Sequence, residues 1–185
     1  MNVAVVVGTT RDGRVTPKLA KLVEKSLREK HDDVSVLDLA EFEIPMLSEA
    51  PWMPDRVLTE GTKKWLDALA KADAYVIVTG EYNHGIPAVL KNALDYTQGE
   101  LRRKPVGIVS HGVVGGARSA EHLRLVLASK IAASVVPDSV TFHGHVDAMI
   151  SDEGELTDEH HNGAALDAHL DDVLWYAKAL KDARA

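Results

Sequence analysis

The sequence predicts an α/β fold, a three-layer α/β/α sandwich around a parallel sheet, on three observations. Short runs rich in Val and Ile alternate along the chain with segments whose apolar residues recur at helical spacing. Five such strand–helix units fill the 185 residues. The strand runs are apolar almost throughout, as expected for strands that helices cover on both faces. We expect residues 1–185 to form a single domain of this kind.

The first two strands and the first helix have clear boundaries. Residues 3–7 are all apolar and are closed by Gly8, which predicts a buried strand. In the helix that follows, Thr16 is placed to cap the N-terminus, Pro17 suits the first helical position, and an apolar stripe recurs at helical spacing. A pair of aspartates then turns the chain into a second short strand at 34–37.

The middle of the chain begins with an irregular segment. Three prolines punctuate residues 39–58, which we expect to be an ordered long loop. A second helix is predicted at about 58–72, because Trp and Leu residues lie on one side of it. The apolar run at 74–79 predicts the third strand, and Pro87 opens a third helix.

The last third of the chain repeats the pattern. A fourth strand is predicted at 105–109, ending at a polar loop at 110–112, and a helix at about 117–130. The last strand region spans 134–142 and is interrupted by a Pro-Asp pair. Apolar residues at 3.6-residue spacing predict a final helix at roughly 160–182.

Composition narrows the functional class. The chain is 45% hydrophobic and 26% charged, which suits one globular domain. It has no cysteine, which excludes disulfides, thiolate catalysis and Cys-ligated metal centres, so redox chemistry would need a bound cofactor. Its longest apolar runs are about five residues, far short of the roughly 18–20 that cross a bilayer, and no basic region precedes an apolar core at the N-terminus. We therefore expect a cytoplasmic protein.

The negative charge is concentrated at one end of the chain. Residues 147–185 contain ten acidic and three basic residues and so account for the whole formal net charge of −7. A neutral body with an acidic end argues against nucleic acid or an anionic membrane as a partner, because both need a concentrated basic face.

Histidines are the residues that could suggest a metal site. His143 and His145 form one pair and His160 and His161 another. Neither pair has a nearby cysteine or an HExxH helix. We therefore predict no metal site.

The loop after the first strand carries an anion-binding pattern. Residues 8–16 match neither the G-x-G-x-x-G fingerprint of dinucleotide-binding folds nor a P-loop. They place hydroxyls and two arginines directly before a helix, whose N-terminal amides and dipole favour an anion such as a monophosphate. The alternative is a plain turn, since Asp12-Gly13 is good turn chemistry and arginines are often only solvated.

The loop after the third strand complements the first. Residues 80–87 carry an aromatic side chain and two glycines at the point where a buried strand ends. In a sheet of order 2-1-3-4-5, the first and third strands are neighbours, and ligands bind outside their carboxyl ends at this switch point. Flavin mononucleotide (FMN) binds there in flavodoxin-like folds. The two loops together therefore favour FMN as the ligand.

Three motifs resemble the NADPH-dependent FMN reductases, a flavodoxin-like group that includes quinone, azo-dye and chromate reductases. They are Gly8-Thr9-Thr10-Arg11 with Gly13-Arg14, Glu81-Tyr82-Asn83-His84-Gly85-Ile86-Pro87, and Leu90-Lys91-Asn92-Ala93-Leu94-Asp95-Tyr96. The resemblance covers most of the chain and implies an FMN-dependent oxidoreductase. Such an enzyme passes hydride from NADPH or NADH through bound FMN to quinones or similar acceptors, with azo compounds, chromate and free flavin as further candidates.

The resemblance also implies site residues by position. The FMN phosphate would be held by Thr9, Arg11, Thr16, Pro17 and the amide of Lys18, with Arg14 a less direct contributor. The isoalloxazine would be lined by Gly80, Glu81, Tyr82, Asn83, His84 and Gly85, largely through backbone groups, and approached from its other side by Ser110 and His111. Gly80 departs from the family, which commonly has Pro there. No side chain is expected to be an obligatory catalytic acid or base, because the cofactor carries the chemistry.

Several alternatives stay open at this point. Tyr82 could simply cover the following helix, His84 is better explained as a structural loop residue than as a proton donor, and His111 is evenly balanced between the two roles. A flavodoxin-like FMN electron carrier would bind FMN without reacting with pyridine nucleotide, and a flavin-sequestering protein would show no turnover. Trp52, Met53 and the face around Tyr96 predict a subunit interface. The resemblance implies that the assembly is a homodimer or homotetramer.

Overall fold

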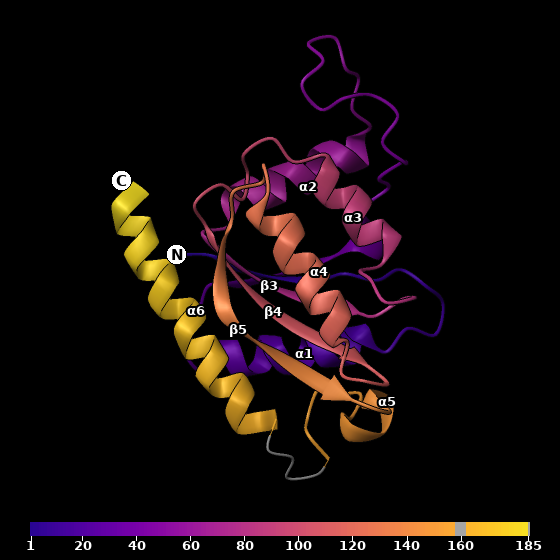
Figure 1. Ribbon diagram of the computed structural model, residues 1–185. Coiled ribbons are helices and arrows are strands. Elements are labelled where there is room, and N and C mark those ends of the chain that lie inside the picture. Colours follow the sequence, from indigo (N-terminus) through magenta and orange to yellow (C-terminus); the bar gives the residue numbers. More distant parts are fainter. Residues whose placement is uncertain (158–161, 185) are drawn as a thin grey trace.

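A computed structural model describes residues 1–157 and 162–184 (Figure 1). Its strands are β1 (Val3–Val7), β2 (Val34–Asp38), β3 (Ala74–Gly80), β4 (Pro105–Gly112) and β5 (Ser134–His143). Its helices are α1 (Thr16–Arg28), α2 (Glu60–Lys71), α3 (Ala88–Asp95), α4 (Ala117–Ala128), α5 (Val146–Met149) and α6 (Asn162–Arg184), with a 3₁₀ turn η1 (Leu39–Glu41).

The five strands form one parallel sheet of order β2-β1-β3-β4-β5. In the centre of the sheet, Val5 of β1 lies opposite Val36 of β2 and Val76 of β3. The predicted fold class and strand order are confirmed. Because all strands run the same way, the loops that follow β1, β3 and β4 meet at one edge of the sheet.

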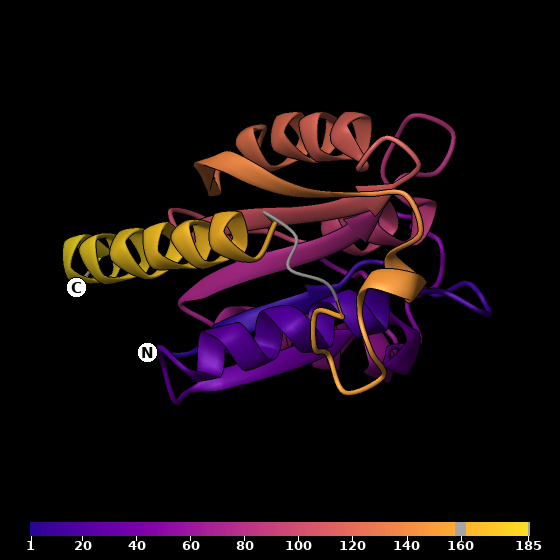
Figure 2. The ribbon, with the colours of Figure 1, turned by 90° about the horizontal axis from the view of Figure 1, so that it is seen from below.

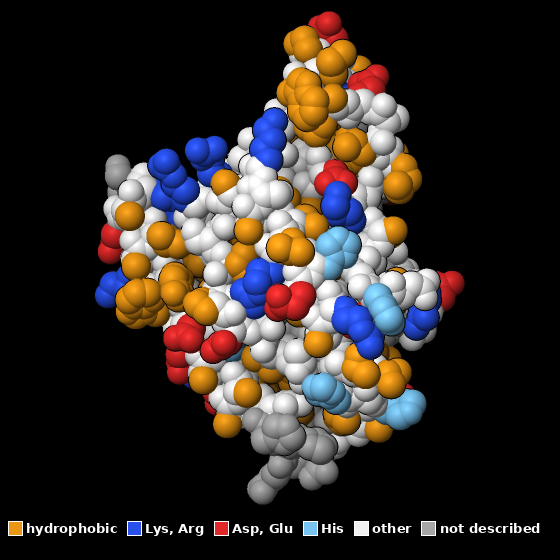
Figure 3. All heavy atoms as spheres, in the orientation of Figure 1, with side chains coloured by type: hydrophobic (Ala, Val, Ile, Leu, Met, Phe, Trp, Pro, Cys, Tyr) orange, Lys and Arg blue, Asp and Glu red, His pale blue; other side chains and the backbone are white. Residues whose placement is uncertain are grey.

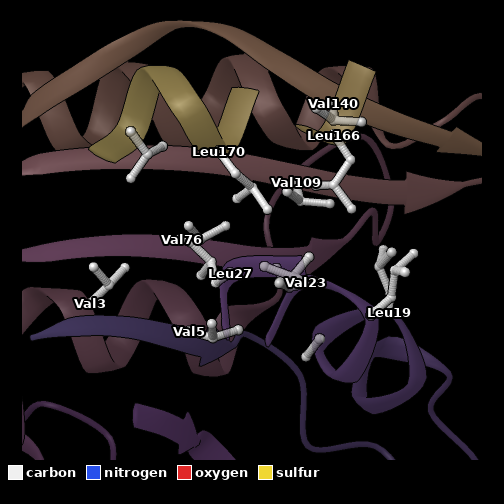
Figure 4. Packing of buried hydrophobic residues seen from close by; sticks show 14 of the residues in the cluster. Val3, Val5, Leu19, Val23, Leu27, Val76, Val109, Val140, Leu166 and Leu170 are labelled. Atoms are coloured by element: carbon white, nitrogen blue, oxygen red, sulfur yellow. The ribbon is translucent and has the colours of Figure 1, made fainter. Parts of the chain in front are cut away.

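Two hydrophobic clusters, one on each face, hold helices against the sheet. In β1, Val3, Val5 and Val7 face α1 and α6, while Ala4 and Val6 face α2, α3 and α4. Figure 2 shows α1 and α6 next to each other on one face, and Figure 4 shows Val5 of β1 near Leu27 of α1 and Val109 of β4 near Leu166 of α6. This alternation of side chains in a strand buried on both faces explains why the strands are apolar runs.

The fourth strand is longer than predicted. We expected it to end at Val109 and to continue as a polar loop, but β4 runs to Gly112. Ser110, His111 and Gly112 pair with residues 141–143 of β5. Polar side chains continue a buried strand here because Ser110 and His111 find specific hydrogen-bond partners.

The start of the first helix also differs from the prediction. Val15, not Thr16, occupies the N-cap position, Thr16 is the first helical residue, and Pro17 is therefore the second. The Thr16 hydroxyl makes no capping bond and instead lies 2.8 Å from Nε2 of His111. The sequence pattern misassigns this residue because its partner is 95 positions away in the chain.

The segment at 39–58 is irregular apart from η1, as predicted, and extends from the body of the molecule (Figure 1). Its first part is fixed by Asn92 of α3, whose side chain accepts from the amide of Leu47 at 2.9 Å and donates to the carbonyl of Pro45 at 2.9 Å. The Tyr96 hydroxyl donates to the same carbonyl at 3.1 Å. These contacts order the loop against α3.

Near the C-terminus, β5 continues through Pro137 with a register shift against β4, so the predicted interruption is an irregularity within one strand. The short helix α5 was not predicted. The final helix is confirmed from Asn162 onward, while His160 and His161 of the histidine pairs lie outside the described residues.

Candidate functional site

Three loops gather at the carboxyl edge of the sheet: residues 8–15 after β1, 81–87 after β3 and 113–116 after β4 (Figure 1). β1 and β3 are neighbours, but the chain leaves them for opposite faces, to α1 and to α3. This arrangement is the topological switch point at which doubly wound folds bind ligands.

The first loop contains a buried hydroxyl with no partner. Thr9 is 1% exposed, and its Oγ1 forms no hydrogen bond with any other described residue. The backbone N–H groups of Thr10, Arg11 and Asp12 likewise donate to no acceptor within residues 1–157 and 162–184. Buried polar atoms are almost always paired, so the Thr9 hydroxyl indicates a missing acceptor on this loop. Arg11 and Asp12 are exposed, so their amides are free to bind a ligand or water.

The two arginines of the loop have different surroundings. Arg14 donates from both terminal nitrogens to the carboxylate of Asp38, at 2.6 and 2.7 Å, and also to the carbonyl of Thr9. The hydrogen bond to Asp38 raises the pKa of Arg14 and fixes the loop to the end of β2. Arg11 is exposed, and its guanidinium lies 5.5 Å from the ring centre of Tyr82. The structure thus brings Arg11 and Tyr82 together, while Arg14 serves to hold the loop.

The residues after the loop enter α1. Thr16 is buried at the first helical position, and Pro17 follows it. The Lys18 amide, which the resemblance implied as a phosphate donor, donates to the carbonyl of Val15 at 3.1 Å, and its ammonium pairs with Asp152 at 2.7 Å. Lys18 is therefore already engaged at both its backbone and its side chain.

The second loop makes a tight turn. Tyr82 and Gly85 exchange two backbone hydrogen bonds, of 3.0 and 3.1 Å. Between them, Asn83 and His84 have φ angles of 47° and 69°, the left-handed values that a two-residue hairpin of type I′ requires. Both side chains are exposed, so the turn presents its backbone at the carboxyl edge of the sheet.

Gly80 ends β3 where the family commonly has Pro. Its carbonyl accepts hydrogen bonds from the hydroxyls of Ser119, at 2.9 Å, and Thr79, at 3.1 Å. A Cβ placed on Gly80 would lie 3.4 Å from the ring of His111 and 3.6 Å from the ring of Tyr82, which is ordinary contact. The absent side chain therefore leaves room that these two rings border.

Glu81 ties the second loop to α4. One carboxylate oxygen accepts from the backbone amide of Arg118 at 3.1 Å, and the other contacts its guanidinium. α4 has no side-chain cap of its own, since its N-cap residue is Gly116. The carboxylate thus satisfies an N-terminal amide of the helix and interacts favourably with its dipole.

The third loop was not identified as part of the site from the sequence. Ser110 is fully buried, and its hydroxyl donates to the carbonyl of Gly115 at 2.8 Å, which shapes the loop rather than facing outward. Gly115 and Gly116 have φ angles of 74° and 72°, which few other residues adopt. The paired glycines after a buried strand are the signal in the sequence that could have identified this loop.

His111 lies between the first and second loops. Its Nε2 is 2.8 Å from Thr16 Oγ1, and its carbonyl accepts from the amide of Glu81 at 3.2 Å. Burial lowers the pKa of His111 to about 4, so the ring is neutral at physiological pH.

Within residues 1–157 and 162–184, no group of three or more His, Cys, Asp or Glu side chains is arranged to hold a metal ion. None of the helices in the described part of the chain is both long and apolar enough to span a membrane.

Several known proteins are similar to this chain in sequence and in fold. The model of the NADPH-dependent FMN reductase family matches residues 1–147. An NAD(P)H-dependent FMN reductase of Schizosaccharomyces pombe is 34% identical over 177 residues, covering 84% of this chain and 88% of the relative. A quinone reductase of Pseudomonas putida is 32% identical, covering 85% and 86%.

Among solved structures, the flavoenzyme NAD(P)H:acceptor oxidoreductase FerB of Paracoccus denitrificans superposes with a TM-score of 0.75 at 26% identity, over 96% of this chain and 97% of that protein. The resemblance read from three motifs is therefore confirmed over most of the chain. The chain belongs to the NADPH-dependent FMN reductase family.

Proposed function

We propose that this protein binds FMN at the carboxyl edge of its sheet and uses it as an NAD(P)H-dependent oxidoreductase of the FMN and quinone reductase type. Bound FMN supplies reversible two-electron chemistry, so that NAD(P)H is oxidised to NAD(P)⁺ and an acceptor such as a quinone is reduced to the hydroquinone with uptake of a proton. The protein's own residues bind, orient and shield the cofactor.

The buried, unpartnered hydroxyl of Thr9 carries this proposal. A phosphate oxygen is an acceptor that this hydroxyl and the unpartnered amides of residues 10–12 could share. Arg11 lies next to them without a carboxylate partner among the described residues and would add a charge-assisted bond. The residues present therefore fit a phosphate-bearing cofactor.

The roles of the remaining site residues follow from their contacts. Thr16 and Pro17 would present the start of α1 to the phosphate, while Arg14 and Lys18 would hold the loop and helix through Asp38 and Asp152. The turn at 82–85 would offer backbone groups to the isoalloxazine edge, with Glu81 holding that turn against α4. The third loop, residues 113–116, would cover the other side of the isoalloxazine, and the hydroxyl of Ser110 holds this loop in place.

No side chain of the site is placed as an obligatory acid or base. His111 is uncharged and bonded to Thr16, and His84 projects from a turn. We propose that the histidines shape the site and that the backbone supplies most of the polar contacts to the ring, which is consistent with chemistry carried by the cofactor.

A spectroscopic titration tests the function. The purified protein, reconstituted with FMN, is expected to show a flavin absorbance band that bleaches on anaerobic addition of NADPH or NADH and returns when a quinone is added. The relative rates with the two nucleotides would define the cosubstrate. If correctly folded protein takes up no FMN, the proposal is wrong.

The same experiment separates two competing functions. A flavodoxin-like electron carrier would bind FMN but bleach only with a reductase present, and a flavin-sequestering protein would show no turnover above that of free FMN. Stopped-flow bleaching and steady-state NAD(P)H oxidation with a quinone distinguish all three. Membership in the reductase family favours direct reaction with NAD(P)H.

We also propose a homodimer or homotetramer located in the cytoplasm, with small-molecule acceptors rather than nucleic acid or membrane as partners. Support for the assembly comes from the projecting loop, on which Figure 3 shows hydrophobic side chains at the surface. Trp52 and Met53 of this loop are 68% and 55% exposed. Tyr96 itself is buried beneath that loop and is not exposed. The interface face predicted around Tyr96 would therefore be formed by neighbouring residues.

A further inference from the structure

The ring of His111 occupies the junction between the loops that would hold the two ends of FMN. On one side, Nε2 lies 2.8 Å from the hydroxyl of Thr16 at the start of α1. On the other, the ring is 3.4 Å from the position that a Cβ of Gly80 would take. The carbonyl of His111 also accepts the amide of Glu81 at 3.2 Å. One residue thus contacts both the helix start and the beginning of the second loop.

We propose that His111 is a positioning residue for the cofactor phosphate, holding the Thr16 hydroxyl so that its single proton is directed to the anion. This inference rests on the proposed function, since the anion is the FMN phosphate. His111 acts through Thr16 and is not placed in contact with the phosphate itself.

The Thr16 hydroxyl and the His111 ring each carry few protons to donate. The Thr16 hydroxyl has one hydrogen to donate and two lone pairs, whereas a neutral imidazole carries its hydrogen on either Nδ1 or Nε2. When the hydroxyl donates to a phosphate oxygen, Nε2 of His111 must itself donate to Oγ1. Anion binding therefore selects the Nε2–H form of the ring, while the protein alone can also use the Nδ1–H form.

Several titratable groups lie on the elements that surround His111. They lie on the first loop (Arg11, Arg14), on α1 (Lys18), on the second loop (Glu81, Tyr82), on α4 (Arg118) and on β5 (His143). Arg14, Lys18 and Glu81 pair with Asp38, Asp152 and Arg118. No described carboxylate forms an ion pair with His111, and burial alone lowers its pKa to about 4. At neutral pH its contribution is a hydrogen bond rather than a charge.

Binding of FMN is compared with binding of riboflavin, which lacks the phosphate. Apo protein is titrated with each flavin at pH 7, and quenching of flavin fluorescence is followed. His111→Leu is expected to weaken FMN binding about tenfold, the effect of losing one hydrogen bond, and to leave riboflavin binding within about twofold. His111→Gln keeps an N–H donor of similar reach and is expected to restore FMN binding to within about threefold of wild type.

A double-mutant cycle checks the route through Thr16. Thr16→Val alone is expected to weaken FMN binding about as much as His111→Leu, and the double variant little more, because both changes remove the same interaction. Nitrogen-15 NMR of the histidine ring gives a readout that does not depend on affinity. FMN, but not riboflavin, is expected to shift His111 to the Nε2–H form.

The outcomes are distinct. Equal weakening of FMN and riboflavin by His111→Leu would mean that the ring only supports the fold, and unchanged FMN binding would mean that it does not act on the phosphate; either result overturns the inference. An additive double variant, or no change in the ring nitrogens, also overturns it. If the wild-type protein binds neither flavin, the failure lies in the proposed function, and the inference falls with it.

Discussion

Thr9 is the residue whose role is most sharply defined by its surroundings. A buried hydroxyl without a partner costs stability, on the order of 1–3 kcal/mol, and persists where a ligand later pairs with it. Thr9 Oγ1 is such an atom, at the start of the loop that joins β1 to α1. We therefore expect the Thr9 hydroxyl to affect the stability of the fold and the binding of FMN in opposite directions.

Replacing Thr9 with Val, which has the same shape, should have opposite effects on stability and on binding. We expect the free energy of unfolding of the apo protein to stay constant or rise, because an unpaired polar atom is removed. FMN affinity should fall by about 1.5–3 kcal/mol, because a hydrogen bond to a charged group is lost. Urea unfolding of the apo protein and flavin titration measure the two quantities.

Thr62 provides the matched control. It is also fully buried, but its hydroxyl pairs with that of Thr59 at 2.8 Å at the start of α2, outside the three loops of the candidate site. Thr62→Val should lower the free energy of unfolding by about 1 kcal/mol and leave FMN affinity unchanged. If Thr9→Val behaves like Thr62→Val, Thr9 is a structural residue.

At the scale of elements, Glu81 joins β3 to α4. Its carboxylate is only 9% exposed and accepts from the Arg118 amide at the start of α4, whereas the Arg118 side chain is 45% exposed. The carboxylate thereby supplies the cap that Gly116 cannot. Loop 81–87 and helix α4 should consequently behave as one unit.

Glu81→Gln keeps the size of the side chain and removes its charge. We expect a loss of about 1 kcal/mol in the free energy of unfolding, as for other N-terminal caps, together with weaker binding of FMN because the loop is less firmly held. Differential scanning calorimetry and flavin titration would show both effects. Glu121→Gln on the same helix is the control, because Glu121 is 70% exposed and its pair with Arg124 at 3.5 Å should contribute little. Indistinguishable variants would refute the capping role.

His169 of α6 is buried against the sheet without a hydrogen-bond partner among the described residues. It is 3% exposed, and a Cβ on Gly107 of β4 would lie 2.6 Å from its Nε2. Burial lowers the pKa of His169 below its ordinary value of 6.5, against a smaller opposing effect of Asp172 and Asp138. Gly107 is thus required by the close approach of α6 to the sheet.

The sign of the pH dependence follows from this shift. A depressed pKa means that the unfolded state binds the proton more readily, so stability is full above about pH 6.5 and is lost as the pH falls toward the pKa of the folded state. His169→Leu should remove this component and flatten the fall in the free energy of unfolding between pH 7 and 5. His111, whose pKa is also lowered, is present in both proteins and cancels from the comparison.

Urea titrations at pH 7, 6 and 5 measure the slope, and His145→Leu is the control, because His145 is exposed. The free energy of unfolding should fall equally steeply with decreasing pH in wild type and His145→Leu, and less steeply in His169→Leu. An unchanged slope in His169→Leu would show that the acid response arises elsewhere.

At the scale of the whole molecule, the sequence predicted the architecture well because the relevant signals are local. Apolar runs such as 3–7 and 74–78 are strands buried on both faces, and the helical stripes between them imply a parallel sheet. The predicted order 2-1-3-4-5 is confirmed, and so is the family. That residues 1–185 form one domain, and that the named site residues hold FMN, remain predictions.

The errors share a physical cause, which is hydrogen bonding between residues distant in the chain. Thr16 resembles a helix cap until His111 is placed beside it, and Ser110 resembles a loop residue until Gly115 accepts its hydroxyl. Arg14 is predicted as a less direct contributor to the phosphate site, and both of its terminal nitrogens already donate to Asp38, so its role toward FMN stays a prediction. Local patterns predict which loops would form the site but not which side chains within them are already paired.

The assembly of the protein is the remaining question at this scale. A groove of about 530 Å³ lies between the projecting loop, α3 and α4, bordered by Trp52, Leu94 and Leu125. Trp52 and Leu125 are 68% and 74% exposed, and the groove also carries the Lys91–Asp95 pair. Large apolar side chains grouped in this way typically mark a subunit interface. A self-complementary contact between two copies would cover the loop and both helices.

Light scattering after size-exclusion chromatography should therefore give a dimer or tetramer for the wild-type protein, and Leu125→Glu should shift it toward monomer by burying a charge in the interface. Trp175→Glu is the control: Trp175 is 66% exposed on α6, which packs on the opposite face of the sheet, and its replacement should leave the assembly intact. A monomeric wild-type protein would contradict the prediction. Dissociation by Trp175→Glu with no effect of Leu125→Glu would instead assign the interface to α6.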